Sequence, residues 1–251
     1  MPRLIFLGTG SILPTRDRFS SGILLETDEE ALLMDIGPGI IEKLRRISFD
    51  LKRINHILIT HLHLDHVADL LPFLKIASLL KRRIKIYGPI GIGRWLDLMI
   101  TDRRIFGYLS DLGCRELVEV HELWDSSLRL DDMTIRAKPV EHFNGIAFRI
   151  ELGDTSITYS GDTMPDRRLI ELARGSTILI HECSFPAGML KGKHTSSEDI
   201  IKIALEVKPR ILILVHLYPE MEKNLPAVLA QLSKTLGIKV YAPKDLEIIE
   251  I

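Results

Sequence analysis

The chain has 251 residues, of which 46% are hydrophobic and 27% charged, and its formal net charge is −1. This near balance excludes a general electrostatic attraction to nucleic acid or to anionic membranes, so an anionic substrate has to be attracted locally. No run approaches the roughly 18 apolar residues of a membrane-spanning helix, no signal peptide is visible, and the two cysteines lack metal-pair spacing, so we expect a cytoplasmic protein without a membrane partner.

Apolar periodicity, with Gly and Pro at the turns, predicts the elements of the first part of the chain. In chain order these are strands at 3–8, 21–27 and 31–37, a helix at 38–47, a strand at 54–60, a helix at 67–81, a strand at 83–89 and a helix at 92–100. Pro38 is expected at the first helical position, and Pro72 in the first turn or at a kink of its helix.

The second part begins with mainly strands and hairpins over 115–160 and then alternates. Helices are predicted at 166–174, 196–207 and 223–237, between strands at 177–182, 210–216, 239–243 and 246–251. Strand-rich halves that each carry helices predict an α/β (α+β) fold, with two sheets face to face and helices outside, as a four-layer αβ/βα sandwich. A doubly wound sheet is the alternative. Because no linker, repeat or composition break occurs, we expect a single domain over 1–251.

The segment "ITHLHLDH" at 59–66 places His61, His63, Asp65 and His66 directly after a predicted buried strand. If the alternation of a strand continues, His61, His63 and Asp65 point one way, whereas Leu62 and Leu64 point into the core. Imidazole and carboxylate together suit zinc, iron or manganese better than calcium. Four donors so close would crowd one tetrahedral ion and favour two ions about 3.5–4 Å apart. A polar surface loop is the alternative.

The H-x-H-x-D-H pattern resembles the metallo-β-lactamase superfamily, which implies that fold and further ligands in three later segments. "VEHFNG" supplies His142, "YSGDT" supplies Asp162 and "LVHLYP" supplies His216. The resemblance implies that one ion is held by His61, His63 and His142, that the other is held by Asp65, His66 and His216, and that Asp162 bridges them. It also implies that Asp35, in "MDIGPG", supports the loop from behind. Buried structural histidines and turn aspartates are the alternatives.

Two further loops, and the start of the chain, resemble the ribonuclease Z branch. Glu182 in "LIHECSF" and His194 in "HTSSEDI" match its H-E-A-T and H-S-T loops, in which a Glu–His pair delivers the leaving-group proton. Cys183 and Ser184 replace Ala-Thr there. Near the start, Pro14, Arg16 and Arg18 match the P-x-K-x-R-N loop, with Arg16 in place of Lys and Phe19 in place of Asn. A helix-capping histidine beside a solvated glutamate is the alternative.

Ribonuclease Z enzymes usually carry a long tRNA-gripping arm between the positions matched by His142 and Asp162. Here residues 143–161 leave room only for two strands and a turn, and the basic run at 79–85 is interpreted as a solvated helix end. The resemblance therefore implies an armless relative. Its expected substrates are small or cyclic phosphodiesters, or RNA 3′ ends, and a homodimer is an expected assembly.

The predicted function is a binuclear metallohydrolase, a phosphodiesterase or ribonuclease Z-like enzyme. Hydroxide shared by two divalent ions would attack phosphorus in line, held by Asp65 and Asp162, while His194, supported by Glu182, protonates the departing alkoxide. Zinc is the expected metal, with manganese or iron as alternatives. The alternative functions are a thioester, lactone or β-lactam hydrolase, an iron oxygenase, and a non-catalytic metal-dependent binding protein.

Overall fold

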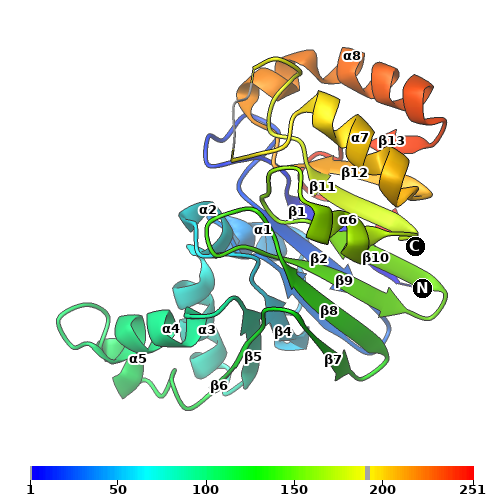
Figure 1. Cartoon of the computed structure of the whole chain (residues 1–251). Helices are drawn as coiled ribbons and strands as arrows, with labels where there is room; N and C mark the ends of the chain where they lie inside the picture. The colour runs from blue at the N-terminus through cyan, green and yellow to red at the C-terminus, as the bar shows by residue number, and fades with distance from the viewer. Residues whose placement is uncertain (1, 190–192) are drawn as a thin grey trace. The chain divides into compact units, whose positions relative to one another are not determined.

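The computed structural model describes residues 2–189 and 193–251 (Figure 1). The chain divides into two compact units. The first unit comprises the residues up to Gly8, Ser20–Leu123 and Leu246–Ile251, and the second comprises Thr9–Phe19 and Trp124–Asp245. Each unit contains one seven-stranded sheet, which rules out the alternative of one doubly wound sheet. That the two units make a single domain stays a prediction.

The sheet of the first unit runs in the order β14-β1-β2-β3-β4-β5-β6. Its strands are β1 (Arg3–Gly8), β2 (Gly22–Glu26), β3 (Ala31–Met34), β4 (Ile54–Leu58), β5 (Ile84–Gly88), β6 (Val118–Glu122) and β14 (Glu247–Glu250). The strands from β3 to β6 pair in parallel, whereas β14, β1, β2 and β3 pair antiparallel. The carboxyl ends of the parallel strands share one edge, and the loop after β4 lies there.

The helices of the first unit pack on its sheet through one continuous apolar cluster. They are α1 (Ile40–Arg46), the 3-10 helix η1 (Leu51–Arg53), α2 (Leu64–Val67), α3 (Leu70–Leu79), α4 (Ile92–Thr101) and α5 (Tyr108–Asp111). Leu33 and Ile57 of the strands meet Leu44, Phe73 and Leu96 of the helices, all 2% exposed or less. Burial of each such side chain stabilises the unit by about 1.5–3 kcal/mol, which fixes the edge on which the β4 loop is built.

The sheet of the second unit runs in the order β13-β12-β11-β10-β9-β8-β7. Its strands are β7 (Ser126–Leu130), β8 (Met133–Pro139), β9 (Ile146–Leu152), β10 (Thr155–Tyr159), β11 (Ile178–Glu182), β12 (Ile211–Val215) and β13 (Lys239–Tyr241), and its helices are α6 (Arg167–Ala173), α7 (Ser197–Val207) and α8 (Pro219–Leu236). β7 to β10 form an antiparallel meander, and β10 to β13 are parallel. Apolar residues of all three helices pack on β11 and β12.

The predicted elements are present, with local differences that have simple causes. Pro38 lies before α1 rather than at its first position, because Gly39 in the left-handed region caps that helix. Pro72 lies in the first turn of α3, as expected. The short α5 was not predicted, since four residues show no helical period. No helix within 2–189 and 193–251 is long and apolar enough to cross a bilayer.

Candidate metal and catalytic site

The four predicted donors of the β4 loop lie together in the first unit. The ring centroid of His61 is 4.6 Å from that of His63 and 4.1 Å from that of His66. Asp65 Oδ2 lies 3.9 Å from His66 Nε2, and both residues belong to α2, which His63 precedes as its cap. One turn of helix directly after a strand therefore gathers three imidazoles and a carboxylate at the carboxyl edge of the sheet.

The leucines of this loop do not alternate as expected. Leu62 packs against the core of the unit, but Leu64 is 68% exposed. The prediction that Leu64 points into the core is wrong, because β4 ends at Leu58 and the chain turns into α2 at Leu64 itself. Helical geometry thus replaces strand alternation within the loop.

Asp35 lies behind the loop and binds it at three donors. Its carboxylate accepts hydrogen bonds from the backbone N of Thr60 at 2.8 Å, from Thr60 Oγ1 at 2.9 Å and from His66 Nδ1 at 2.8 Å. Thr60 Oγ1 also lies 3.0 Å from His61 Nδ1. Asp35 is fully buried and has a φ of 58°, a left-handed conformation that costs energy for a residue other than glycine. The fold maintains this strain where the carboxylate orients two imidazoles.

Gly37 allows the loop to lie close to the turn after β3. A Cβ atom at Gly37 would stand 2.1 Å from the carbonyl oxygen of Asp65, a backbone atom. Two backbone hydrogen bonds form at this close contact. Ile36 N donates to His66 O at 2.8 Å, and Ser21 N donates to Asp65 O at 3.1 Å. Gly37, the first glycine of "DIGPG", is therefore required for the donor loop to lie this close.

The second unit brings its three predicted donors together from loops that follow β8, β10 and β12. Asp162 Oδ2 lies 3.3 Å from His216 Nε2 and 4.0 Å from His142 Nε2. His216 follows β12 with a φ of 55°, so a second strained residue stands at a donor position. One donor atom each of Asp162, His194 and His216 lies within 4.8 Å of the others, which is compatible with holding an ion.

Glu182 and His194 form a pair beside Asp162. His194 Nδ1 lies 3.1 Å from Glu182 Oε1 and 3.9 Å from Asp162 Oδ2. Glu182 is fully buried at the end of β11, and it also accepts from the backbone N of Thr163 at 2.6 Å and from Ser184 Oγ at 2.6 Å. Since Nδ1 donates to the carboxylate, Nε2 is the nitrogen through which His194 can exchange a proton.

The loop that carries His194 is held at both sides. Thr195 Oγ1 donates to Thr163 O at 2.8 Å, and Ser184 N donates to Thr195 O at 3.1 Å. Ser196 then caps α7, with the predicted capping box to Asp199 present in both directions. These bonds hold His194 two residues before Ser196, the N-cap of α7, and next to the end of β11.

Ser184 connects this pair to a predicted metal ligand. Its Oγ lies 2.6 Å from Glu182 Oε2, 3.1 Å from His216 Nδ1 and 3.3 Å from His216 O. Thr60 was not predicted as a site residue, and Ser184 was noted only because it replaces a threonine of the resembled loop. The only signal was position, because Thr60 directly precedes His61 and Ser184 replaces a family threonine.

The predicted donors fit divalent ions. Four predicted ligand histidines have a hydrogen-bond partner at Nδ1: His61 to Thr60 Oγ1, His66 to Asp35 Oδ2, His142 to Lys193 O at 3.3 Å, and His216 to Ser184 Oγ. Such contacts, which orient the ring and leave Nε2 as the coordinating atom, are usual for metal-ligating histidines. The residues present can therefore hold metal through imidazole nitrogen and carboxylate oxygen.

Arg18 holds the opening loop of the second unit, Thr9–Phe19, in place. Its side chain is buried and therefore not exposed to a substrate. Its guanidinium is 2% exposed and donates to Thr9 Oγ1, Ala242 O and Pro243 O. Asp245 closes the loop by accepting from the backbone N of Thr9 and Phe19. Leu217 N donates to Thr9 O, so this fastening adjoins the loop of His216. Pro14 and Arg16 lie exposed between the fastened ends.

Two buried side chains next to Glu182, those of Cys183 and His181, have pKa values shifted in the direction that favours their neutral forms. Burial, with the charge of Glu182, raises the pKa of the Cys183 thiol far above its usual range, so the sulfur stays protonated. Burial lowers the pKa of His181, whose Nδ1 donates to the backbone O of Glu182 at 2.7 Å. Neither side chain belongs to the clusters of candidate metal donors found among the described residues.

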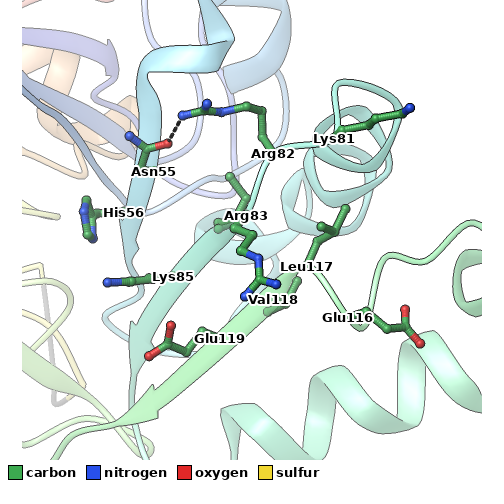
Figure 2. Close-up of a pocket in the computed structure, with 11 residues that line it drawn as sticks. Asn55, His56, Lys81, Arg82, Arg83, Lys85, Glu116, Leu117, Val118 and Glu119 are labelled. Atoms are coloured by element: carbon green, nitrogen blue, oxygen red, sulfur yellow. Dashed lines mark hydrogen bonds between the residues drawn. The ribbon is translucent and has the colours of Figure 1, made fainter.

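The basic run lies elsewhere in the first unit. Lys81, Arg82, Arg83 and Lys85 line a depression of about 650 Å³ at the amino-terminal ends of β4, β5 and β6. Figure 2 shows these side chains. Glu116 and Glu119 line it as well, and Arg82 Nη2 donates to Asn55 Oδ1 at 2.7 Å. The donor loop follows the opposite, carboxyl end of β4. The charges here are mixed and lie apart from the donors, as expected for a solvated helix end.

The chain matches the profile of a known family and is similar to a ribonuclease Z. The sequence profile of the family described as Anti-Pycsar protein Apyc1 matches residues 2–232. Ribonuclease Z of Mycolicibacterium gilvum (strain PYR-GCK) is 30% identical over 252 aligned positions, which cover 88% of this chain and 86% of that protein.

Two solved structures are similar along their whole length. The metallo-beta-lactamase fold protein YhfI from Bacillus subtilis is 22% identical with a TM-score of 0.83, covering 100% of this chain and 99% of that one. Human tRNase Z, short form (ELAC1), is 22% identical with a TM-score of 0.78, covering 99% of each chain. The predicted metallo-β-lactamase fold is thereby confirmed.

Proposed function

Because the chain belongs to the Anti-Pycsar protein Apyc1 family and is ribonuclease Z-like, we propose that its two donor sets jointly hold two divalent ions and that it hydrolyses small phosphodiesters. A metal-dependent, ribonuclease Z-like hydrolase was the predicted class, and the relatives support it over an oxygenase or a thioester or lactone hydrolase. The pair Glu182–His194 is the single observation that carries the proposed cleavage of phosphodiesters.

The proposed ligand sets follow the two units. His61, His63 and His142 would hold one ion, whereas Asp65, His66 and His216 would hold the other. Asp162 would bridge, which is supported by its distances of 3.3 Å to His216 Nε2 and 4.0 Å to His142 Nε2. The Nδ1 contacts described above support coordination through Nε2. When bound, two divalent ions lower the pKa of a water ligand and polarise a phosphoryl oxygen.

Zinc is the proposed metal. Five imidazoles and two carboxylates form a nitrogen-rich set that zinc accepts in tetrahedral or five-coordinate geometry. Manganese and iron accept the same donors, so the donor types alone do not select among them.

His194 is the proposed proton donor to the leaving group. Its Nδ1 is held by Glu182 at 3.1 Å, so Nε2–H is the group directed away from the carboxylate. The buried carboxylate stabilises the protonated imidazole before transfer and orients the ring during it. A hydrolase of activated esters does not need such a donor, whereas cleavage to a free alkoxide does. This requirement is why the pair favours phosphodiesters with poor leaving groups.

Small or cyclic diesters are the proposed substrates, because the chain lacks room for an arm. The stretch between His142 and Asp162 consists of β9 and β10 joined by a short turn, Thr155 pairing with Leu152. The basic depression of Figure 2 mixes basic side chains with Glu116 and Glu119 and is not proposed as an RNA surface. Short RNA 3′ ends remain chemically equivalent substrates at the same bond.

The test is a substrate panel on protein whose metal content has been measured by elemental analysis. The panel contains bis-p-nitrophenyl phosphate, a 3′,5′-cyclic nucleotide, a 2′,3′-cyclic nucleotide, a precursor tRNA with a 3′ trailer, a lactone and a thioester. We expect two ions per chain and turnover of the small diesters well above that of the precursor tRNA. Turnover of lactone or thioester alone would overturn the proposal. Asp162→Asn, measured in parallel, identifies any activity due to a contaminating enzyme.

A further inference from the structure

Each unit contains a buried carboxylate that binds one imidazole directly and a second one through a hydroxyl group. In the first unit Asp35 binds His66 Nδ1 at 2.8 Å, and Thr60 Oγ1 stands between the carboxylate, at 2.9 Å, and His61 Nδ1, at 3.0 Å. Asp35, Thr60, His61 and His66 are all at most 1% exposed. Solvent therefore does not replace these contacts.

The second unit repeats the arrangement with different residue types. Glu182 binds His194 Nδ1 at 3.1 Å, and Ser184 Oγ stands between the carboxylate, at 2.6 Å, and His216 Nδ1, at 3.1 Å. The carboxylate sits on a strand end in this unit and on a left-handed turn in the other. The same three-group chain thus arises twice in unrelated local structure.

The direction of the hydrogen bonds follows from donor and acceptor chemistry. A carboxylate only accepts, so the single hydroxyl proton of Ser184 points at Glu182, and 2.6 Å is the length of a charge-assisted O–H···O bond. The alternative acceptor, His216 O, is farther away at 3.3 Å. The remaining lone pairs of Ser184 can only accept, so His216 Nδ1 must be the protonated nitrogen. The same reasoning fixes the proton of His61 on Nδ1 through Thr60.

We propose that Thr60 and Ser184 are positioning residues that fix the Nδ1–H tautomers of His61 and His216, so that each ring presents the Nε2 lone pair for metal. This rests on the proposed function, in which both histidines are ligands. Without the hydroxyl, Nδ1 loses its acceptor and the two tautomers become comparable in energy. Loss of such a contact behind a ligand typically lowers metal affinity about 10–100-fold.

The positioning role of Ser184 can be separated experimentally from proton donation by His194. Glu182 binds His194 through Oε1 and Ser184 through Oε2, so removal of the serine hydroxyl leaves the bond to His194 in place. The Ser184 variant should therefore bind metal more weakly but, once saturated, respond to leaving-group pKa as the wild type does. A defect in proton donation would show the opposite pattern.

The experiment compares hydroxyl removal with hydroxyl retention at both positions. Ser184→Ala and Thr60→Val remove the group, and Ser184→Thr and Thr60→Ser keep it. Ser176→Ala is the matched control, because Ser176 is also a buried serine of the second unit, bonded to Thr158 Oγ1 at 2.7 Å and to Arg149. Zinc affinity is measured by competition with a chromophoric chelator. Histidine tautomers are read by long-range ¹H–¹⁵N NMR at about pH 8, with and without zinc.

We expect Ser184→Ala and Thr60→Val to lose about 10–100-fold in zinc affinity, with near wild-type affinity in the retaining variants and in Ser176→Ala. The NMR spectrum of wild-type protein should show His61 and His216 protonated at Nδ1, and in each removal variant the corresponding ring should show mixed tautomers. If one variant fails to fold by circular dichroism, the pair in the other unit decides.

In protein that binds zinc, either of two outcomes would overturn the inference: Nε2-protonated His61 or His216 in the wild type, or removal variants with the affinity of Ser176→Ala. Failure of the proposed function looks different, because wild-type protein would then bind no zinc or cleave no diester. The tautomer spectrum of metal-free protein still tests the two hydroxyl contacts in that case. Correct tautomers without zinc binding would leave these contacts as purely structural and also overturn the inference.

Discussion

Glu182 Oε1 and His194 Nδ1 lie 3.1 Å apart, although eleven residues separate them in the chain. The carboxylate is fully buried and has two other donors, Thr163 N and Ser184 Oγ, so it is held in one orientation. His194 is only partly buried. A fixed base behind a partly exposed imidazole is an arrangement that orients a proton donor.

His194→Ala should therefore reduce turnover of diesters with alkyl leaving groups about 10²–10⁴-fold. Bis-p-nitrophenyl phosphate should lose much less, because its nitrophenolate departs without a proton. The measurement is a plot of log kcat against leaving-group pKa for wild type and variant. A uniform loss across all leaving groups would show that His194 binds substrate or metal instead.

Gly37→Ala should disturb the donor loop of the first unit. The added Cβ would stand 2.1 Å from the carbonyl oxygen of Asp65, so backbone must shift. We expect the free energy of unfolding to fall by about 1–3 kcal/mol, measured by urea titration, together with weaker zinc binding. Gly93→Ala, inside α4, is the matched control and should change stability by less than about 1 kcal/mol. Equal effects of the two substitutions would contradict the steric argument.

The strands and donor positions could be predicted because they have sequence signatures. The run before His61 is rich in β-branched and apolar residues, and His216 follows a similar run in β12. His142 follows β8, whose apolar residues alternate with polar ones, and Asp162 follows β10. Within each unit the predicted donors do lie close to one another. Their assignment to particular ions stays a prediction.

Thr60 and Ser184 could not be predicted, because a single hydroxyl has no period and its role depends on a distant carboxylate. Thr60 meets Asp35, 25 residues away, and Ser184 meets His216, 32 residues away. Leu64 was misplaced for a related reason. Alternation cannot show where a strand gives way to a helix, and only the backbone bonds of α2 decide it.

Arg18 and Arg16 should behave differently, although both match the opening loop of the family. Arg18→Ala leaves Ala242 O and Pro243 O without their buried donor, so we expect a loss of about 1–3 kcal/mol in the free energy of unfolding. Arg16→Ala is the matched control: its side chain is exposed, and the change should stay within about 0.5 kcal/mol. Chemical denaturation of both variants measures this. A stable Arg18→Ala protein with impaired turnover would instead place Arg18 at the substrate.

His181 should make the fold sensitive to mild acid. The ring is fully buried, and desolvation lowers its pKa below the ordinary value of 6.5. The unfolded chain therefore takes up a proton below about pH 6.5 that the folded chain does not, so unfolding becomes easier as pH falls through that window. One such proton contributes a slope of at most about 1.4 kcal/mol per pH unit. Well above pH 6.5 both states are neutral at this ring and the contribution is flat.

Replacing the ring isolates this contribution, since the other histidines titrate in both proteins. We expect the free energy of unfolding of wild type to decline more steeply than that of His181→Leu between about pH 6.5 and pH 5, measured by urea titration with chelator present. Chelator is needed because release of metal from ligand histidines would add its own slope. Parallel curves would mean that His181 is protonated to the same extent in both states. Its Nδ1 bond to the carbonyl of Glu182 would then coexist with a charged ring, and burial would not control its ionisation.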